Sequence, residues 1–159
     1  MLDFDGEYTH KIDKKGRVFM PTALLEEVKE ASERGHFHVM ANRAVGCFDV
    51  YTDSEFKKFR RSALSKEKTA LGARLLRRYI GASTRKVKVD TQNRILLPEE
   101  LRSRIKLEGE VLIIGLGNSI EIWDAKVYAD SAFPEADEYF GAEAATLRNA
   151  DYVPEEGEL

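Results

Sequence analysis

The stretch "DKKGR", Asp13–Arg17, is followed by the apolar run "VFMP", and the same arrangement returns as "DTQNR", Asp90–Arg94, followed by "ILLP". Lys11–Val28 and Lys88–Ile105 align over eighteen positions, of which five are identical and five exchange one apolar residue for another. A second occurrence of so long a pattern indicates an internal repeat. The sequence therefore predicts two copies of one supersecondary unit in a single chain.

Each copy is expected to begin with a β-hairpin. Alternating polar and apolar residues at Tyr8–Ile12 and Arg85–Val89 are typical of half-buried strands. Short apolar runs, Val18–Met20 and Ile95–Leu97, predict the second strand of each hairpin. The four residues DKKG or DTQN remain for the turn between the strands.

The turn residues suit a bulged hairpin. Asp13 and Asp90 occupy the first turn position, where a carboxylate can accept a backbone N–H. Gly16 and Asn93 occupy the fourth position, and these residue types best tolerate the left-handed backbone that such a hairpin needs. The two turns are therefore predicted to share one backbone conformation despite their different chemistry.

A helix and a second hairpin are predicted after each turn. Pro21 and Pro98 suit a first helical turn, where proline loses no hydrogen bond. The apolar pairs expected on the helical faces are Leu24 with Val28 and Leu101 with Ile105. The breaks and strands that follow are expected at Gly35 and Gly109, then at Phe37–Met40, Cys47–Tyr51, Val111–Ile114 and Ser119–Trp123.

The predicted fold is mainly β with α (α+β). Neither copy, at about 45 residues, could bury its apolar face alone. The two strand–turn–strand–helix–hairpin units are therefore expected to close one small β-barrel about a pseudo-twofold axis. The expected parts are a first repeat (residues 1–52), a basic helical linker (53–83), a second repeat (84–124), and a short helix with an acidic tail (125–159).

The linker is expected to be helical. The sequence "TDSE", Thr52–Glu55, predicts a capped helix start before Phe56 and Phe59. A second apolar stripe at helical spacing consists of Leu71, Leu75 and Tyr79. These aromatic and apolar residues fit subunit contacts and core packing about equally well.

The chain of 159 residues has a net charge of −3, but the charge is unevenly distributed. Ser54–Lys88 holds twelve Lys and Arg against two acidic residues, whereas Asp124–Leu159 holds two against ten. The basic region could meet phosphates, and the acidic end could repel them or keep the protein soluble. Charge runs are commonly solvated faces, so charge alone does not establish a nucleic-acid partner.

Several function classes find no support in the sequence. We expect no enzymatic activity, cofactor, metal or small-molecule substrate, because His10, His36 and His38 belong to no familiar ligand pattern. The glycine-rich Gly115–Ser119 is predicted to be a hairpin turn, not a phosphate loop. The single Cys47 is expected to be a small buried residue and favours a reducing, cytoplasmic compartment. No membrane span or signal peptide is recognisable.

The order D-x-x-G/N-R, apolar run, P-x-x-L resembles the swapped-hairpin, AbrB-like DNA-binding fold of bacterial transition-state regulators and antitoxins. Two such units joined by "ALGARLLRRYIGAS", Ala70–Ser83, resemble the MraZ family over nearly the whole chain. The resemblance implies a transcriptional regulator that binds double-stranded DNA at repeated boxes upstream of its own operon, which encodes division and cell-wall genes. It also implies a nucleoid-associated homo-oligomer that assembles into closed rings.

The resemblance further implies which residues meet DNA. Contacts to bases or phosphates are expected from Lys14, Lys15, Arg17, Thr91, Gln92 and Arg94, and positioning of the loops from Asp13, Gly16, Asp90 and Asn93. Asn93 stands where the family usually has glycine, and Leu25 stands where a basic residue is common, as Arg102 illustrates. Because Thr91 and Gln92 carry no charge, the two turns are not expected to contribute equally.

Two alternatives remain open at this point. Each Asp–Arg pair could be an ion pair that stabilises its turn without any ligand. The protein could also be an oligomeric scaffold that does not contact DNA. RNA is a weaker alternative, because the sequence offers no set of exposed aromatic residues on one sheet face.

Overall fold

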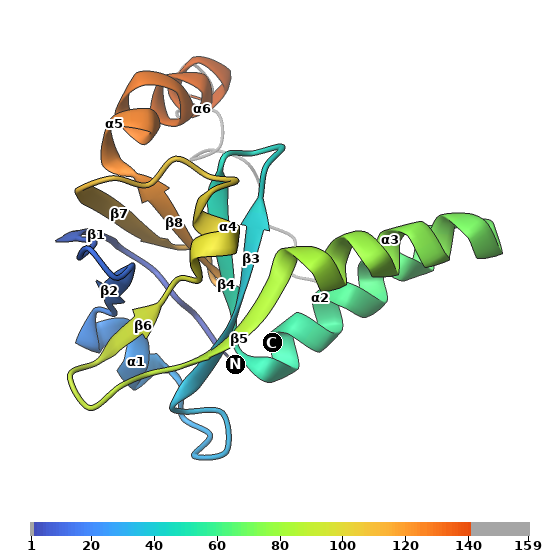
Figure 1. The fold of residues 1–159 in the computed structure, drawn as a ribbon, viewed down its shortest axis with the longest axis horizontal. Helices are drawn as coiled ribbons and strands as arrows, with labels where there is room; N and C mark the ends of the chain where they lie inside the picture. The colour runs from blue at the N-terminus through green and yellow to red at the C-terminus, as the bar shows by residue number, and fades with distance from the viewer. Residues whose placement is uncertain (1, 141–159) are drawn as a thin grey trace, which may run out of the picture. The chain divides into compact units, whose positions relative to one another are not determined.

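A computed structural model describes residues 2–140, as α+β structure with β-strands and several helices (Figure 1). The chain divides into two compact units, Met1–Ala125 and Lys126–Leu159. The α+β fold class predicted from the sequence is confirmed. The four-part division expected from the sequence stays a prediction.

The first unit contains the two predicted copies in the same element order. The first copy consists of β1 (Glu7–Lys11), β2 (Arg17–Phe19), α1 (Thr22–Glu27), β3 (His36–Asn42) and β4 (Cys47–Tyr51). The second consists of β5 (Thr84–Lys88), β6 (Arg94–Leu96), α4 (Glu99–Arg102), β7 (Glu110–Gly115) and β8 (Ile120–Asp124). The internal repeat is thus a structural repeat.

The strands pair between the copies as well as within them. Six antiparallel strands follow the order β1-β7-β8-β4-β3-β5, and β2 and β6 form a separate two-stranded sheet. The first strand of each copy therefore pairs with the third strand of the other: β1 with β7, and β5 with β3. This reciprocal exchange is the swapped arrangement that the family resemblance implied. Closure of these strands into one barrel stays a prediction.

Matching backbone hydrogen bonds fix the exchange at both ends. The N–H of Ile12 donates to the carbonyl of Gly109 at 2.8 Å, and the N–H of Val89 donates to the carbonyl of Gly35 at 2.8 Å. Ile12 corresponds to Val89 in the repeat, and Gly35 corresponds to Gly109. The two contacts are therefore related by the pseudo-twofold axis.

One hydrophobic core is built from both copies. Phe37 and Phe48 of the first copy and Ile113 and Ile122 of the second belong to the same buried cluster. Burial of apolar area is the main favourable contribution to folding. Separating the copies would expose this shared core, so they are expected to fold as one unit.

Helices α1 and α4 are shorter than the sequence suggested. Val28 and Ile105 are buried but lie beyond the ends of the helices that hold Leu24 and Leu101. Val28 has an extended backbone, with φ −76° and ψ 95°. Packing into the core therefore fixes these two β-branched residues outside the helices, so the expected apolar pairs do not lie on one helical face.

Two longer helices, α2 (Asp53–Ser65) and α3 (Ala70–Ser83), lie side by side and project from the sheet (Figure 1). The Thr52 side chain accepts from the N–H of Glu55 at 3.3 Å, which confirms the predicted capped start. Thr69 caps α3 in the same way through the N–H of Gly72, at 2.9 Å. Each side chain satisfies a backbone donor that has no partner within its helix.

The two candidate apolar faces of the linker differ in burial. Phe56 is buried, and its ring lies 6.0 Å from that of Tyr51, so it belongs to the packing of this chain. Leu71, Leu75 and Tyr79 are 67%, 49% and 48% exposed. Packing within the chain therefore explains why Phe56 is apolar, but it does not explain the exposed apolar stripe of α3.

From Lys126 to Phe140, the described residues of the second unit are helical. Its elements are α5 (Ala125–Val127), a π-helical segment η1 (Tyr128–Ala132) and α6 (Phe133–Phe140). The remainder of the predicted acidic tail lies outside the described residues. Within residues 2–140, no helix combines the length and the apolar composition needed to cross a membrane.

A cluster of polar side chains lies where the two copies meet. Asp49 of β4 and Glu121 of β8 are directly opposite each other, and the thiol of Cys47 lies 3.8 Å from Asp49 and 3.6 Å from Glu121. Cys47 is buried as predicted, but it borders carboxylates as well as apolar side chains. Asn42 donates to Asp49 at 3.0 Å, and the Trp123 indole donates to Glu121 at 3.0 Å.

This arrangement raises the pKa of Asp49, first through burial and then through the neighbouring charge of Glu121. A carboxyl group whose pKa is raised on folding contributes stability below its unfolded pKa and loses it as pH rises through the folded pKa. At neutral pH, the Asp49 carboxylate therefore opposes folding.

We expect Asp49→Asn to raise the free energy of unfolding at pH 7 by about 1 kcal/mol, because the amide carries no charge beside Glu121 and its oxygen can still accept from Asn42. The gain should shrink as the pH falls toward 4. Urea unfolding at pH 7 and pH 4.5 would measure it.

Asp53 provides a control of opposite sign. Hydrogen bonds from His38 and Lys57 lower the pKa of Asp53 to about 2, so Asp53→Asn should reduce stability at pH 7. A loss of stability at pH 7 in Asp49→Asn would contradict the assignment of Asp49 as a destabilising charge.

Candidate nucleic-acid interface

The first Asp–Arg turn is held by one carboxylate. Oδ1 of Asp13 accepts from the backbone N–H groups of Lys15, at 3.0 Å, and Arg17, at 2.9 Å. Oδ2 accepts from the Nε of Arg17 at 2.6 Å. A single side chain thus closes the turn and fixes the direction of the arginine.

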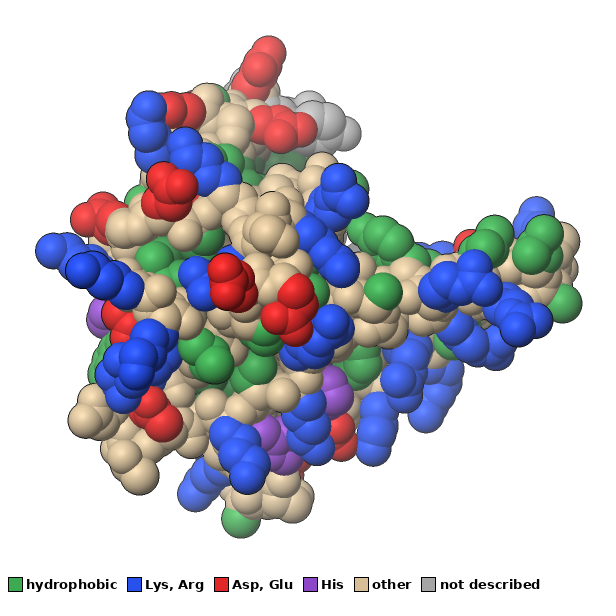
Figure 2. Space-filling view, in the orientation of Figure 1, with side chains coloured by type: hydrophobic (Ala, Val, Ile, Leu, Met, Phe, Trp, Pro, Cys, Tyr) green, Lys and Arg blue, Asp and Glu red, His purple; other side chains and the backbone are tan. Residues whose placement is uncertain are grey.

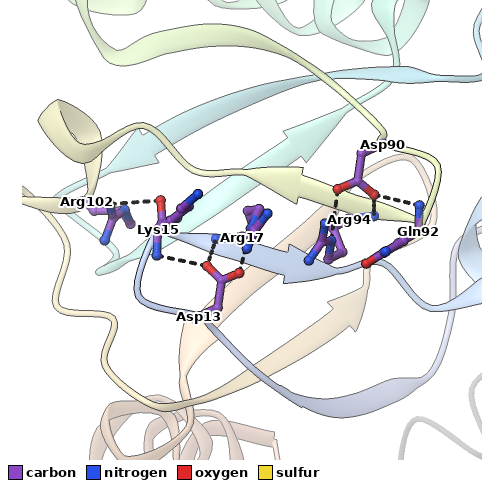
Figure 3. Close-up of polar contacts among 7 residues, drawn as sticks. All are labelled: Asp13, Lys15, Arg17, Asp90, Gln92, Arg94 and Arg102. Atoms are coloured by element: carbon purple, nitrogen blue, oxygen red, sulfur yellow. Dashed lines mark hydrogen bonds and ion pairs between the residues drawn. The ribbon is translucent and has the colours of Figure 1, made fainter.

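The second turn repeats this arrangement (Figure 3). Oδ1 of Asp90 accepts from the N–H groups of Gln92 and Arg94, both at 2.9 Å, and Oδ2 accepts from the Nε of Arg94 at 2.9 Å. The same three hydrogen bonds therefore form although the residues between Asp and Arg differ.

The fourth turn position has the predicted left-handed backbone in both copies. Gly16 has φ 89° and Asn93 has φ 59°. Asn93 is the only residue other than glycine with positive φ in residues 2–140. The departure from glycine in the second copy therefore leaves the backbone of the turn intact.

Hydrogen bonding lowers the pKa of both aspartates. The backbone N–H of Arg17 is the largest cause that lowers the pKa of Asp13, and the N–H of Arg94 has this role for Asp90. Each guanidinium uses Nε for its aspartate, and its terminal nitrogens form no hydrogen bond with the described residues. Both arginines therefore keep donors for another molecule.

The β2–β6 sheet joins the two turns into one ribbon. Arg17 pairs with Leu96, and Phe19 pairs with Arg94. The N–H of Leu97 also donates to the carbonyl of Gly16 at 2.8 Å, so the first turn is bonded to the end of the opposite strand. The distance between the two turns is consequently set by a short, paired segment.

The ribbon has an outer face that the sequence interpretation missed. Alternation along each strand and the cross-strand register place Arg17, Phe19, Arg94 and Leu96 on one face. Phe19 is 37% exposed and Leu96 is 48% exposed, whereas Val18 on the opposite face is buried. Period-two alternation within "RVF" and "RIL" is the signal that could have identified them.

The pseudo-twofold symmetry is broken behind the turns. Arg102 donates through Nε to the carbonyl of Leu97 at 2.8 Å and through a terminal nitrogen to that of Lys15 at 3.4 Å. Its guanidinium lies over Gly16, where an added Cβ would come 2.6 Å from Cζ. Arg102 therefore braces the first turn by direct contact with its backbone.

The corresponding residue behind the second turn is Leu25. It lines a pocket of about 290 Å³ together with Asn93, Asp90 and Arg34. The second turn thus lacks the arginine brace and has an open space in its place. The two turns share one backbone but differ in support as well as in charge.

The exposed residues of the turns complete the predicted site. Lys14, Lys15, Thr91 and Gln92 are exposed, and no ion pair within the described residues holds either lysine. All ten predicted site residues belong to the two turns at the ends of the ribbon. Their roles toward DNA stay predictions.

Other chemistry-bearing residues lie apart from the ribbon. Within residues 2–140, the only close group of three possible metal ligands is Cys47, Asp49 and Glu121, whose ligand atoms lie within 4.8 Å of one another. Sequence spacing could not reveal this group, because its members come from different copies. The His38 imidazole is bonded to Asp53 at 2.8 Å.

Comparison with known proteins places these features in a family. The family model described as "MraZ protein, putative antitoxin-like" matches residues 4–79 and 80–149. A protein from Heliobacterium modesticaldum named "Transcriptional regulator MraZ" is 37% identical over 138 residues, which cover 85% of this chain and 92% of that protein.

Two further relatives have the same name. The protein from Halothermothrix orenii is 36% identical, with 81% of this chain and 88% of that protein covered. The protein from Mycoplasmoides gallisepticum is 33% identical, with 79% and 84% covered. With one matched unit for each Asp–Arg turn, and with relatives aligned over most of their length, this chain belongs to the MraZ family.

Proposed function

We propose that this protein is an oligomeric, sequence-specific regulator of transcription that contacts double-stranded DNA through the β2–β6 ribbon and its two turns. The observation that carries the proposal is the pair of identically held arginines, Arg17 and Arg94, at the two ends of one ribbon. A two-stranded ribbon is one of the elements that fit the major groove.

The arginines are suited to reading bases. Each guanidinium is already oriented by its aspartate, so it loses less conformational freedom when it meets a ligand. Its terminal nitrogens can donate in parallel to the O6 and N7 atoms of guanine or to phosphate oxygens. Lys14 and Lys15 add phosphate contacts at the first turn, and Thr91 and Gln92 offer hydrogen bonds at the second.

Two apolar residues that lie opposite the arginines across the ribbon extend this role. Phe19 and Leu96 share the outer face of the ribbon with Arg17 and Arg94. Apolar side chains in the major groove contact the methyl group of thymine. Each end of the ribbon would thus combine one guanine or phosphate contact with one apolar contact, because Leu96 lies opposite Arg17 and Phe19 lies opposite Arg94.

Resemblance to the family supports a proposal for the target and the assembly. We propose that the DNA consists of repeated boxes upstream of the protein's own operon, with division and cell-wall genes, and that subunits form a closed ring. The exposed α3 stripe of Leu71, Leu75 and Tyr79 provides an apolar subunit surface. One subunit contributes a small contact, and a ring gains affinity through effective concentration. Such a protein would reside in the cytoplasm, associated with the nucleoid.

A second candidate is an assembly protein that does not contact DNA. The exposed α3 stripe favours it, because large exposed apolar patches mark interaction surfaces. In that case each Asp–Arg pair would serve only its own turn. The two candidates make different predictions for substitutions in the turns.

We expect Arg17→Ala to weaken binding to the upstream DNA by roughly 5- to 150-fold per site, since a good arginine contact contributes about 1–3 kcal/mol. Arg94→Ala should have a smaller effect, because its turn lacks the two lysines. Fluorescence anisotropy at two salt concentrations, beside a scrambled DNA, would measure affinity, selectivity and salt dependence.

The control for Arg17→Ala is Arg43→Ala, which removes the same charge from the exposed β3–β4 turn. Asp13→Asn is a second variant, because its oxygen can still accept the backbone N–H groups while the charge that orients Arg17 is lost. Unchanged DNA binding in Arg17→Ala and Arg94→Ala, with oligomer size intact, would favour the assembly protein.

A DNA containing three boxes should bind far more tightly than one containing a single box, because the ring then engages several subunits at once. Anisotropy titrations with one, two and three boxes in DNA of constant length would measure the gain. Equal affinity for one and three boxes would contradict the multivalent mechanism.

We expect Leu75→Asp to reduce oligomer size, because a charge would be desolvated in the middle of the proposed subunit surface. Sedimentation velocity would measure the size, and circular dichroism would verify that α3 is retained. Arg74→Asp, at the exposed position just before Leu75 and outside the stripe, is the control for introducing an acid. An unchanged assembly in Leu75→Asp would place the subunit contact elsewhere.

A further inference from the structure

A pocket of about 480 Å³ lies where α2 and α3 meet strands β3 and β5. Its apolar lining includes Phe56 and Leu64 from α2 and Ile80 from α3, and its basic lining consists of Arg60, Arg77 and Lys86. Pockets that bind small molecules have volumes of about 300–1,000 Å³ and combine apolar walls with a few polar groups. This pocket has both properties.

The three cations of the pocket come from three different elements. Arg60 belongs to α2, Arg77 to α3 and Lys86 to β5, and none of them forms an ion pair within the described residues. Arg60 lies over the ring of Phe56, with Cζ 5.4 Å from the centroid. The carboxylate of Asp53 is already shared between His38 and Lys57, at 2.8 and 3.1 Å. The positive charge in the pocket is therefore uncompensated by these residues.

The floor of the pocket is apolar and open. Phe56 and Ile80 are buried, and Gly81 lines the pocket without a side chain. No heavy atom lies within 4 Å of a Cβ added at Gly81. The space above this glycine can therefore hold part of a ligand without displacing protein atoms.

We propose that this pocket binds a small organic anion, in which a carboxylate or phosphate is attached to an apolar or aromatic body. The anionic group would lie among Arg60, Arg77 and Lys86, and the apolar body would rest on Phe56, Leu64 and Ile80. A bare phosphate would satisfy the cations but leave the apolar floor unfilled. A neutral apolar molecule would leave the cations unpaired.

The proposed pocket is separate from the DNA-contacting ribbon. Its residues belong to α2, α3, β3 and β5, whereas the turns lie at the ends of β2 and β6. Lys and Arg side chains gather along the α2–α3 arm (Figure 2). The site at the base of this arm differs from a row of charges on a helix, because the buried Phe56 and Ile80 form an apolar floor between the exposed cations.

The experiment is a fluorescence titration with 1-anilinonaphthalene-8-sulfonate, an anion attached to aromatic rings, as the probe. Arg77→Ala should weaken binding at least tenfold, whereas Arg78→Ala, which removes the same charge from an exposed neighbour outside the pocket, should change it less than twofold. This pair of variants separates the pocket from the general charge of α3.

A second pair of variants tests the pocket by filling it. Gly81→Leu should abolish saturable binding of the probe, because the new side chain occupies the floor. The substitution favours the helix, since leucine has a higher helix propensity than glycine. Ala82→Leu places the same side chain on an exposed position outside the pocket and should leave binding unchanged.

Competition distinguishes the possible anions. Naphthoate and naphthyl phosphate should each displace the probe, and their relative strength identifies carboxylate or phosphate as the better group. Inorganic phosphate should displace it only at concentrations at least a hundredfold higher.

Any of three results would overturn the proposal. The first is equal probe binding in wild type, Arg77→Ala and Gly81→Leu, which would place the probe on another surface such as the α3 stripe. The second is equally tight binding of neutral N-phenyl-1-naphthylamine. The third is displacement by inorganic phosphate as efficient as by naphthyl phosphate.

Discussion

The exchange of strands between the two copies is the constraint on which the rest of the structure depends. β1 finds its partner in β7, and β5 finds its partner in β3, so each copy completes the sheet of the other. Unpaired backbone groups at a buried edge are costly, and a unit of about 45 residues has too little core to compensate. The exchange therefore makes one folding unit from two sequences. It also fixes β2 against β6, which brings Arg17 and Arg94 to opposite ends of a ribbon only three residue pairs long.

Within this symmetric frame, the two turns have diverged in chemistry while keeping their hydrogen bonds. Asp13 and Asp90 make the same three bonds, which explains why Lys14 and Lys15 can be replaced by Thr91 and Gln92 without changing the turn. The support behind the turns differs because Arg102 covers Gly16, whereas Leu25 leaves a pocket beside Asn93. With one braced, strongly basic turn and one neutral, less supported turn, the ribbon is asymmetric in both charge and support.

Much of this fold could be predicted from local sequence signals. The Asp at the start of each turn and the Gly or Asn at its fourth position specify hydrogen bonds and a left-handed residue within five positions, so no distant contact is needed. The exchange itself followed from family resemblance, because alternation in Tyr8–Ile12 does not identify the partner strand. Periodicity predicted that Val28 and Ile105 lie on α1 and α4. Both residues are buried, but they lie beyond the ends of these helices.

The features that escaped prediction depend on contacts between distant segments. Asp49 and Glu121 are 72 positions apart, and only the β4–β8 register makes them neighbours. The exposure of Phe19 and Leu96 depends on which face of the ribbon the core covers. The pocket beneath Arg60, Arg77 and Lys86 requires the packing of two helices on two strands. Sequence periodicity predicts which residues share a face of a helix or strand, but it does not predict which other segment packs against that face.

The segment from residue 70 to residue 94 contributes to all three candidate surfaces: the apolar stripe, the pocket and the second turn. Within it, α3 is followed directly by β5, with no loop between them. One face of α3 exposes Leu75 and Tyr79, and the opposite face lines the pocket with Arg77 and Ile80. α3 ends at Ser83 and β5 begins at Thr84, and β5 leads directly to the turn that begins at Asp90. No loop separates α3 from β5, so the proposed subunit surface, the pocket and the second turn lie on consecutive elements of one stretch of chain. Local sequence signals identify each of these elements, but only the packing of α3 on β3 and β5 divides its residues between an exposed stripe and a pocket wall.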